Sequence, residues 1–379
     1  MIRMTKIFLT ANTDWYLYNF RISLAEFLRE KNYEVVFISP KGKFVDKIIE
    51  RGFRWIEWEL NRKSTNPFSE LIALKNLAKI FKNEKPDLVH NHTIKSCLYG
   101  TLAARIVGIH SVVNSITGRG YVFSEQDKKA NFLRGIVKIL YRVALNHPNC
   151  NLIFENANDQ KYFIDEKLIS SSEKTVLIKG VGVDENLFAP TEEPKGKPII
   201  LLASRMLWEK GVGVLVDATK ILKQKYDFIT VLAGEPDPSN PGSIPESTLR
   251  MWEKEGLVEW WGFQAEINKV YQKSHIVTLP TMYNEGVPTN LLEASSSSRA
   301  IVASDMPGCT DFIIEGENGF LVPRNDSKSL AIALEKLLKD PALRNQMGKI
   351  GRKMILQNYT KEIVNTKTLN VFKKLLLSK

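Results

Sequence analysis

The stretch PIILLASRMLWEKG (198–211) decides how this chain folds. An apolar, β-rich run leads directly into a polar loop that carries Arg205 and Lys210, with Gly211 behind the lysine. A strand that passes through a turn into a helix is the unit from which parallel α/β sheets are built. An arginine fork and a lysine at such a turn suit a diphosphate, because the helix N-terminus adds N–H donors and partial positive charge. A solvated surface pair is the alternative interpretation.

A second strand-to-helix stretch, HIVTLPTMYNEGVPTNLLEAS (275–295), carries the carboxylates of Glu285 and Glu293. A glycine and a proline between them indicate a tight turn and a helix start, so the backbone N–H groups of 286–290 are predicted to point toward an anion or a hydroxyl. Carboxylates accept well from vicinal hydroxyl pairs, so one glutamate can hold a hexose and the other a ribose. The contacts predicted in this stretch are Glu285, Gly286, Val287, Pro288, Thr289 and Glu293.

Short β-rich runs alternate with helical stretches such as 22–31 and 69–81, which predicts parallel sheets in an α/β fold. The polar stretch PTEEPKGK (190–197) is expected to link two doubly wound, Rossmann-like domains, with ligands at the carboxyl ends of the strands. The expected strands are 5–10, 33–38, 87–89, 111–114, 151–154 and 175–178, then 198–203, 227–234, 257–262, 275–280, 300–304 and 319–323.

The composition is that of a soluble globular protein, with 379 residues, 44% hydrophobic and 25% charged. No run approaches the roughly 20 apolar residues of a membrane-spanning helix, and we expect no cleavable signal. Three scattered cysteines fit a reducing compartment, so cytoplasm is expected. Of the net charge of +11, +8 falls within residues 1–190. The first half is therefore expected to meet an anionic partner; nucleic acid, membrane and phosphorylated substrates all satisfy that charge.

Nine stretches, two of them within those already quoted, carry a resemblance to a known family. They are YNFR (18–21), HNHTIKS (90–96), ITGRGYVF (116–123), FENANDQ (154–160), KGVGVDENLF (179–188), SRMLWEKG (204–211), WWGFQAEI (260–267), YNEGVPTNLLEA (283–294) and SDMPGCTDFI (304–313). Together they resemble the retaining glycosyltransferases of family four. The resemblance implies the GT-B fold, in which two Rossmann-like domains face each other across a cleft. It also implies an acceptor-binding domain over 1–187 and a nucleotide-sugar-binding domain over 188–379, whose last helix crosses back to the first domain.

The resemblance implies how a donor is held. Arg205 and Lys210 would bind the nucleotide diphosphate. Glu285 would bind the donor sugar hydroxyls and Glu293 the ribose, while Gln264, in the turn after a predicted strand, would lie near the base. Arg205, Lys210 and Glu285 are therefore the expected catalytic residues.

Retention in this family is pictured as front-face attack, in which the donor β-phosphate oxygen takes the acceptor proton and leaves on the same face. No protein nucleophile is then required, and the enzyme acts by position and electrostatics. The two cations would replace a metal, since no DxD motif follows a strand and no metal-ligand spacing is present. We expect no metal and no cofactor, with a UDP-sugar as the donor substrate.

Within the family, YNFR, HTIKS, TGRGY and PDPSNPGSIP look most like bacterial enzymes that extend a sugar carried on undecaprenyl diphosphate. This implies a UDP-sugar donor, with N-acetylgalactosamine as an example of the hexose, and a lipid-diphosphate-linked saccharide as acceptor. It also implies peripheral attachment to the cytoplasmic face of the inner membrane.

Candidates for acceptor contacts lie in the first half. His92 and Lys95 follow the third predicted strand, with Lys95 near an acceptor diphosphate; a satisfied loop histidine is the alternative for His92. Asn19 and Arg21 open the first expected helix, where they would orient a sugar or phosphate or would only cap the helix. Arg119 stands in a loop where family members often carry a histidine, and it is expected to meet an acceptor phosphate. The predicted acceptor contacts are Asn19, Arg21, His92, Lys95, Thr117 and Arg119.

The stretch 128–145 contains no acidic residue and places Arg134, Lys138 and Arg142 at four-residue spacing on one helical face. Such a basic amphipathic helix can lie in the headgroup layer of an anionic membrane, with an attraction of about 1 kcal/mol per basic residue. A core helix with a charged outer face is the alternative. An acceptor carried on a lipid favours membrane contact.

Two other functions remain open at this point. A nucleotide-sugar epimerase or hydrolase can use the same fold, because fold does not fix function. A basic nucleic-acid-binding protein without catalysis would also satisfy the charge. The sequence contains no recognised nucleic-acid module or basic aromatic platform, so we expect no nucleic-acid partner.

Overall fold

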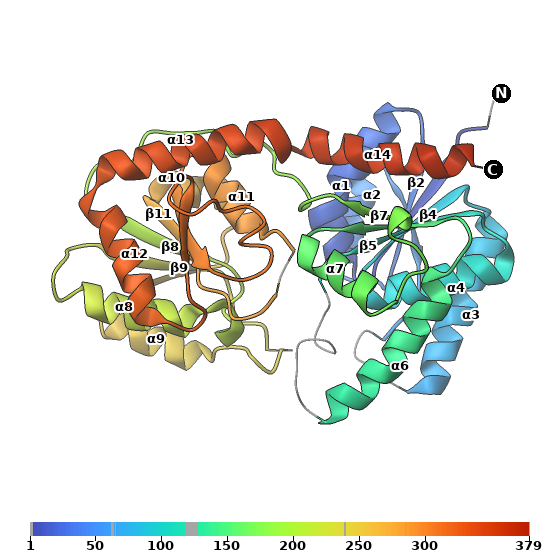
Figure 1. The fold of residues 1–379 in the computed structure, drawn as a ribbon, viewed down its shortest axis with the longest axis horizontal. Helices are drawn as coiled ribbons and strands as arrows, with labels where there is room; N and C mark the ends of the chain where they lie inside the picture. The colour runs from blue at the N-terminus through green and yellow to red at the C-terminus, as the bar shows by residue number, and fades with distance from the viewer. Residues whose placement is uncertain are drawn as a thin grey trace. The chain divides into compact units, whose positions relative to one another are not determined.

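The computed structural model describes residues 3–61, 64, 66–118, 128–238, 240–284 and 286–378. The chain divides into two compact units, one of Met1–Val181 with Lys361–Lys379 and one of Gly182–Thr360 (Figure 1). Each unit is a parallel sheet with helices packed on both faces, as the alternation of strands and helices predicts. The α/β class is therefore confirmed.

The sheet of the first unit has the order β3-β2-β1-β4-β5-β6-β7. All six predicted strands are present, and a seventh, β3, was missed. The sequence of β3, RWIE, has charged ends that are exposed at the edge of the sheet, so it lacks the apolar run that marks the others. The strands are β1 (Lys6–Thr10), β2 (Glu34–Ser39), β3 (Arg54–Glu57), β4 (Leu88–His92), β5 (Ser111–Ile116), β6 (Cys150–Phe154) and β7 (Thr175–Leu177).

Helices cover both faces of this sheet. One face carries α3, α4, α6 and α7, and the other carries α1, α2 and α14. The helices are α1 (Asp14–Glu30), α2 (Val45–Glu50), α3 (Pro67–Glu84), α4 (Ile94–Val107), α6 (Lys128–Leu145), α7 (Ala157–Asp165) and α14 (Lys361–Leu377).

The first helix begins earlier than expected. Thr13 caps α1 by accepting a hydrogen bond from the backbone N–H of Tyr16 at 3.2 Å. Asn19 and Arg21 therefore lie inside the helix, and the interpretation that they open or cap it is wrong.

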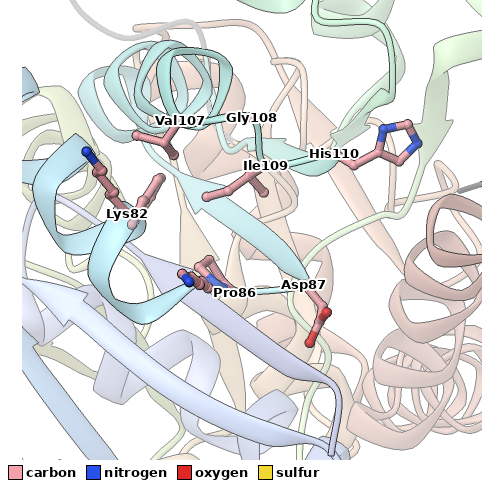
Figure 2. A pocket seen from close by; sticks show the side chains of 9 residues that line it. Lys82, Pro86, Asp87, Val107, Gly108, Ile109 and His110 are labelled. Atoms are coloured by element: carbon pink, nitrogen blue, oxygen red, sulfur yellow. The ribbon is translucent and has the colours of Figure 1, made fainter. Parts of the chain in front are cut away.

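A shallow pocket lies at the amino edge of the first sheet. Figure 2 shows Lys82, Pro86 and Asp87, just before β4, facing Val107 to His110, just before β5. This pocket is at the opposite end of the strands from the carboxyl edge, where parallel sheets bind ligands. None of the residues predicted for the functional site lines it.

The sheet of the second unit has the order β10-β9-β8-β11-β12-β13, and all six predicted strands are present. Its strands are β8 (Ile199–Ala203), β9 (Ile229–Ala233), β10 (Glu259–Gly262), β11 (Ile276–Leu279), β12 (Ala300–Ser304) and β13 (Gly319–Val322). Its helices are α8 (Val212–Leu222), α9 (Glu246–Lys254), α10 (Ile267–Lys273), α11 (Thr289–Ser296), α12 (Ser327–Lys339) and α13 (Pro341–Asn358), and a 3₁₀ turn, η2, spans Trp208–Lys210.

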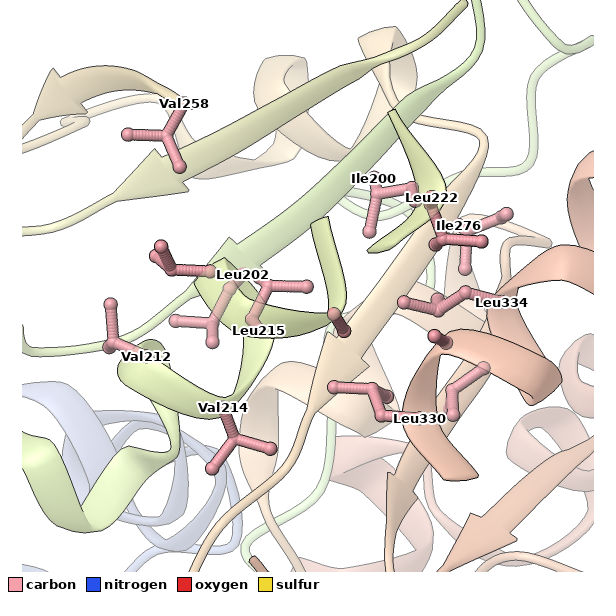
Figure 3. Close-up of a cluster of buried hydrophobic side chains, with 14 of the residues drawn as sticks. Ile200, Leu202, Val212, Val214, Leu215, Leu222, Val258, Ile276, Leu330 and Leu334 are labelled. Atoms are coloured by element: carbon pink, nitrogen blue, oxygen red, sulfur yellow. The ribbon is translucent and has the colours of Figure 1, made fainter. Parts of the chain in front are cut away.

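Alternating side chains of β8 enter the two cores of the second unit. Ile200 and Leu202 are buried in a cluster with residues of α8 and α12, part of which Figure 3 shows. Leu201 and Ala203 are buried on the opposite face, against α10, α11 and α13. Because both faces of β8 are packed, the strand fixes the start of the loop that follows it.

The strand order reverses between β8 and β11, which pair directly through Ile276 with Ile200 and Val277 with Leu201. The loops that leave these two strands at the carboxyl edge therefore start side by side. In doubly wound sheets this switch point is where ligands bind. The loops that meet at this switch point are 204–211 and 280–290, which carry predicted donor contacts.

The boundary between the units falls before residue 182, so the expected boundary at 187/188 is too late. Residues 182–188 pack on the second unit. Val183 donates its backbone N–H to the Tyr359 carbonyl at 2.9 Å, and the ring of Phe188 packs on Tyr271. The last helix, α14, groups with the first unit, where Asn365 donates to the Ser23 hydroxyl at 3.1 Å.

Gly211 lets the loop after β8 approach the loop after β11. It has a φ of 76°, and a Cβ atom there would lie 1.9 Å from the Pro280 carbonyl oxygen. Gly256 offers a matched control, with a φ of 68° and nothing within 4 Å of its Cβ position.

We expect Gly256→Ala to lower the free energy of unfolding by about 1 kcal/mol through backbone strain alone. Gly211→Ala should lower it by about 3 kcal/mol, because the methyl group also displaces a carbonyl. Urea denaturation of both variants measures the difference. An equal loss of unfolding free energy in the two variants would contradict the close approach of Gly211 to the Pro280 carbonyl.

Candidate functional site

Arg205 and Lys210 reach the carboxyl edge of the second sheet on either side of the loop after β8. The Arg205 side chain is 47% exposed, and its Nη1 donates to Oδ2 of Asp237 at 2.9 Å. The Lys210 ammonium lies 5.3 Å from the centroid of the Tyr283 ring. Asp237 follows β9 and Tyr283 follows β11, so the two cations flank the switch point.

Hydrogen bonds fasten the two loops of the switch point together. The backbone N–H of Met282 donates to the Glu209 carbonyl at 2.7 Å. The side chain of Asn290, in the first turn of α11, donates to the carbonyl of Ala203, the last residue of β8, at 3.0 Å. The lysine and the start of α11 are thus held in one arrangement, which limits the reorganisation that ligand binding would require.

The turn before α11 buries its apolar side chains. Val287 packs in the core and Pro288 is buried after it, so neither side chain is free to contact a ligand. Pro288 makes no side-chain cap bond at the start of the helix. Gly286 is buried and Thr289 is half-buried beside it. Glu285 lies outside the described residues.

Glu293 is held by a residue that sequence reasoning missed. The hydroxyl of buried Tyr271, in α10, donates to Oε2 of Glu293 at 2.9 Å. Burial, and then the neighbouring carboxylate, raise the pKa of Tyr271 well above its ordinary value, so the hydroxyl stays protonated and remains a donor. Nothing in the sequence pairs these residues, because Tyr271 reads only as an apolar position of a helix.

Gln264 follows β10, the edge strand of the sheet. Its side-chain amide donates to the Trp261 carbonyl at 2.6 Å, so this donor is used within its own turn. Trp260 donates its indole N–H to the Gly234 carbonyl at 2.8 Å, so its polar group is used within the second unit.

A buried polar cluster lies at the carboxyl edge of the first sheet. Arg21 forms a 3.4 Å ion pair with Glu155 and donates to the Tyr16 hydroxyl at 2.6 Å. The Tyr16 ring lies 5.6 Å from that of His92, whose ring is tilted against that of His90 with centroids 4.0 Å apart. The structure thus joins two predicted residues, Arg21 and His92, through Tyr16, which was not predicted.

Burial determines the charge of this cluster. It lowers the pKa of His90 and His92 well below the ordinary imidazole value, so both rings are neutral. The His92 Nδ1 lies 3.0 Å from the Thr10 carbonyl, whereas Nε2 has no hydrogen-bond partner within the described part of the chain. The interpretation of His92 as a satisfied histidine therefore accounts for only one of its nitrogens.

Two other predicted acceptor residues, Asn19 and Lys95, are bonded to other parts of the first unit. Asn19 is exposed and donates to the Trp15 carbonyl at 2.8 Å. Lys95 donates to the Asn61 and Ser64 carbonyls and to Glu70, at 3.0, 2.7 and 2.7 Å, so its ammonium binds the segment before and within α3. Thr117 is half-buried directly after β5, and Arg119 lies outside the described residues.

Two basic residues of α6 are bonded to the end of α7. Lys138 pairs with Glu166 at 2.7 Å, and Arg142, which is exposed, donates to the carbonyls of Glu166 and Lys167. The exposed residues of α6 include the apolar Ile136, Ile139 and Val143 beside Arg142.

No group of three or more His, Cys, Asp or Glu side chains is placed to hold a metal ion in the part of the chain that the structure describes. None of the helices within the described ranges is long and apolar enough to cross a membrane.

Two family models match the chain, and each falls within one unit. The model described as "Glycosyl transferase 4-like" matches residues 6–153, and "Glycosyl transferases group 1" matches residues 183–354. Among solved structures, a glycosyltransferase from Rickettsia africae superimposes with a TM-score of 0.81 at 21% identity and covers 99% of both chains. An Anabaena protein in complex with UDP-glucose gives a TM-score of 0.76 at 18% identity, over 97% of this chain and 99% of that one.

Curated relatives match over most of the length. The chain is 30% identical, over 94% of its residues and 95% of the relative, to the N,N'-diacetylbacillosaminyl-diphospho-undecaprenol alpha-1,3-N-acetylgalactosaminyltransferase of Campylobacter jejuni. It is 24% identical, over 89% of both chains, to the UDP-Gal:alpha-D-GlcNAc-diphosphoundecaprenol alpha-1,3-galactosyltransferase of Escherichia coli. This chain therefore belongs to the family-four glycosyltransferases of the GT-B fold.

Proposed function

We propose that this glycosyltransferase moves a hexose, with N-acetylgalactosamine as the first candidate, from a UDP-sugar to a saccharide carried on a polyprenyl diphosphate. It does so with retention of configuration and without a metal ion. The observation that carries the proposal is the placement of Arg205 and Lys210 on either side of the switch point of the second sheet. The names of the Campylobacter and Escherichia relatives support the acceptor class.

The reaction breaks the bond between the sugar C1 and the donor β-phosphate oxygen and forms a bond from C1 to the acceptor oxygen. The acceptor proton goes to the departing phosphate oxygen. Negative charge grows on the diphosphate as it leaves, and two cations fixed at that place stabilise the charge. Glu293, oriented by Tyr271, accepts from the ribose hydroxyls, and Glu285 is assigned to the hexose.

The acceptor is assigned to the first unit. Arg21 supplies a positive charge there, and Nε2 of His92, which has no hydrogen-bond partner among the described residues, supplies a neutral nitrogen beside it. Thr117 and Arg119, after β5, stay predictions for the acceptor phosphates. These assignments bear on the acceptor alone and are independent of the donor site.

We also propose that the first unit rests on an anionic membrane surface. The exposed residues of α6 include the apolar Ile136, Ile139 and Val143 together with the basic Arg142, and the helix has no acidic residue to repel phospholipid headgroups. The helix α3 exposes Phe68, Leu71 and Ile72 in its first turns. Both helices follow a strand of the parallel sheet and precede another, so both begin at its carboxyl end. Apolar side chains ringed by basic ones are typical of interfacial helices.

Incubation with a panel of UDP-sugars and a lipid-diphosphate-linked monosaccharide in EDTA tests the reaction. We expect one UDP-hexose to give a disaccharide with an α-anomeric signal by NMR, at a rate that EDTA does not change. A β-anomer would contradict retention, and a rate restored only by a divalent ion would contradict metal independence. Conversion of the UDP-sugar without an acceptor would favour an epimerase or hydrolase.

Arg205→Ala and Lys210→Ala should each lower kcat by about 100- to 1,000-fold, because each removes a charge that stabilises the leaving diphosphate. Thermal unfolding should stay unchanged, since the Arg205 side chain is largely exposed. Lys197→Ala, which removes an exposed partner of Asp227, is the control and should leave kcat unchanged. Near wild-type turnover in both test variants would exclude this donor site.

Ile139→Asp should weaken binding to phosphatidylglycerol vesicles at least about tenfold, because it removes an apolar contact and adds a repelled charge. Ile332→Asp on α12 is the control, since Ile332 is 58% exposed and Ile139 is 60% exposed. Vesicle co-sedimentation measures both variants. An equal loss of vesicle binding in the two variants, or no loss in Ile139→Asp, would mean that α6 does not make the membrane contact.

A further inference from the structure

The segment 235–245, EPDPSNPGSIP, has no role in the donor site described above, yet it is bonded to the loop that carries Arg205. Met206 donates its backbone N–H to the Glu235 carbonyl and receives one from Ile244, both at 2.9 Å. The N–H of Trp208 donates to the Gly242 carbonyl at 2.9 Å. These bonds on both sides make the segment a fixed wall beside the arginine.

Asp237 is the residue of this wall that reaches Arg205. Its own backbone N–H donates to the Ser243 hydroxyl at 2.9 Å, and its carbonyl accepts from the N–H of Asn240 at 2.8 Å. The carboxylate is therefore placed by its backbone, whichever partner the side chain has. It meets the guanidinium at 2.9 Å, with side chains 25% and 47% exposed.

A diphosphate and this carboxylate require the same guanidinium. An exposed ion pair is weak and exchanges readily, whereas a diphosphate carries more negative charge and can accept two parallel N–H bonds. Arg205 can thus pass from Asp237 to the nucleotide when a donor arrives. It can pass back when the nucleotide leaves.

We propose that Asp237 is a positioning residue that competes with the nucleotide diphosphate for Arg205. It holds the guanidinium at the mouth of the site when no nucleotide is bound and lowers the affinity for UDP by the strength of its own ion pair. The inference rests on the proposed role of Arg205 and adds to it a residue that tunes product release. Removal of a competing anion should tighten UDP binding without any new contact.

The test is a double-mutant cycle on the full-length protein, with UDP alone titrated by calorimetry. Asp237→Asn should bind UDP about two- to fivefold more tightly than wild type, the range that an exposed ion pair can account for. The same substitution in the Arg205→Ala background should leave the UDP affinity unchanged, because the group being competed for is gone. Asp217→Asn, which breaks the exposed pair with Lys220 on α8, is the matched control and should have no effect.

Three results would overturn the inference. An equal gain in both backgrounds would mean that Asp237 repels the phosphates through space, and an unchanged or weaker affinity would mean that it only builds the wall. A lowered thermal midpoint of Asp237→Asn without nucleotide would assign it a structural role. Failure of the proposed donor site is a separate outcome, since wild type would then not bind UDP or Arg205→Ala would bind it as tightly as wild type.

Discussion

The approach of Gly211 to the carbonyl of Pro280 is the constraint on which the second unit depends. Strands β8 and β11 are neighbours whose following loops leave the same edge, so those loops must pack against each other or diverge. A glycine with positive φ lets them pack, and the bond from Met282 to the Glu209 carbonyl secures the contact. The loop that carries both cations is then held at a rigid sheet edge, and charge placed in advance in this way is an effective means to stabilise a leaving anion.

At the carboxyl edge of the first unit the arginine is buried, whereas in the second unit it is exposed. Arg21 is buried with Glu155, and burial raises the pKa of that carboxyl while the arginine opposes the shift. Buried ion pairs contribute little net stability because both charges lose hydration, so a pair kept beside two neutral histidines points to positioning more than to stability. The second unit instead leaves Arg205 exposed, where a ligand can displace its partner.

Sequence was sufficient wherever local pattern decides structure. The apolar runs predicted strands from β1 to β13, except β3, whose charged edge residues conceal it. Their position directly after a predicted strand then placed Arg205 and Lys210 at the carboxyl edge of the second sheet, whereas the strand order that makes this place a switch point came only from the structure. Partners that are distant in sequence could not be predicted. The pairing of Tyr271 with Glu293 and that of Asp237 with Arg205 depend on which segments the fold brings together. The partner of Lys138 on α6 was equally hidden, because Glu166 lies at the end of another helix and cannot be found by periodicity.

The central claim is that the donor diphosphate binds to the side chains of Arg205 and Lys210 at the edge of the second sheet. A crystal structure of the protein with UDP tests it most directly. The account predicts guanidinium and ammonium nitrogens about 3 Å from phosphate oxygens, with a Glu293 oxygen at hydrogen-bond distance from the ribose. Density for UDP elsewhere, or with both side chains turned away from the phosphates, would contradict it.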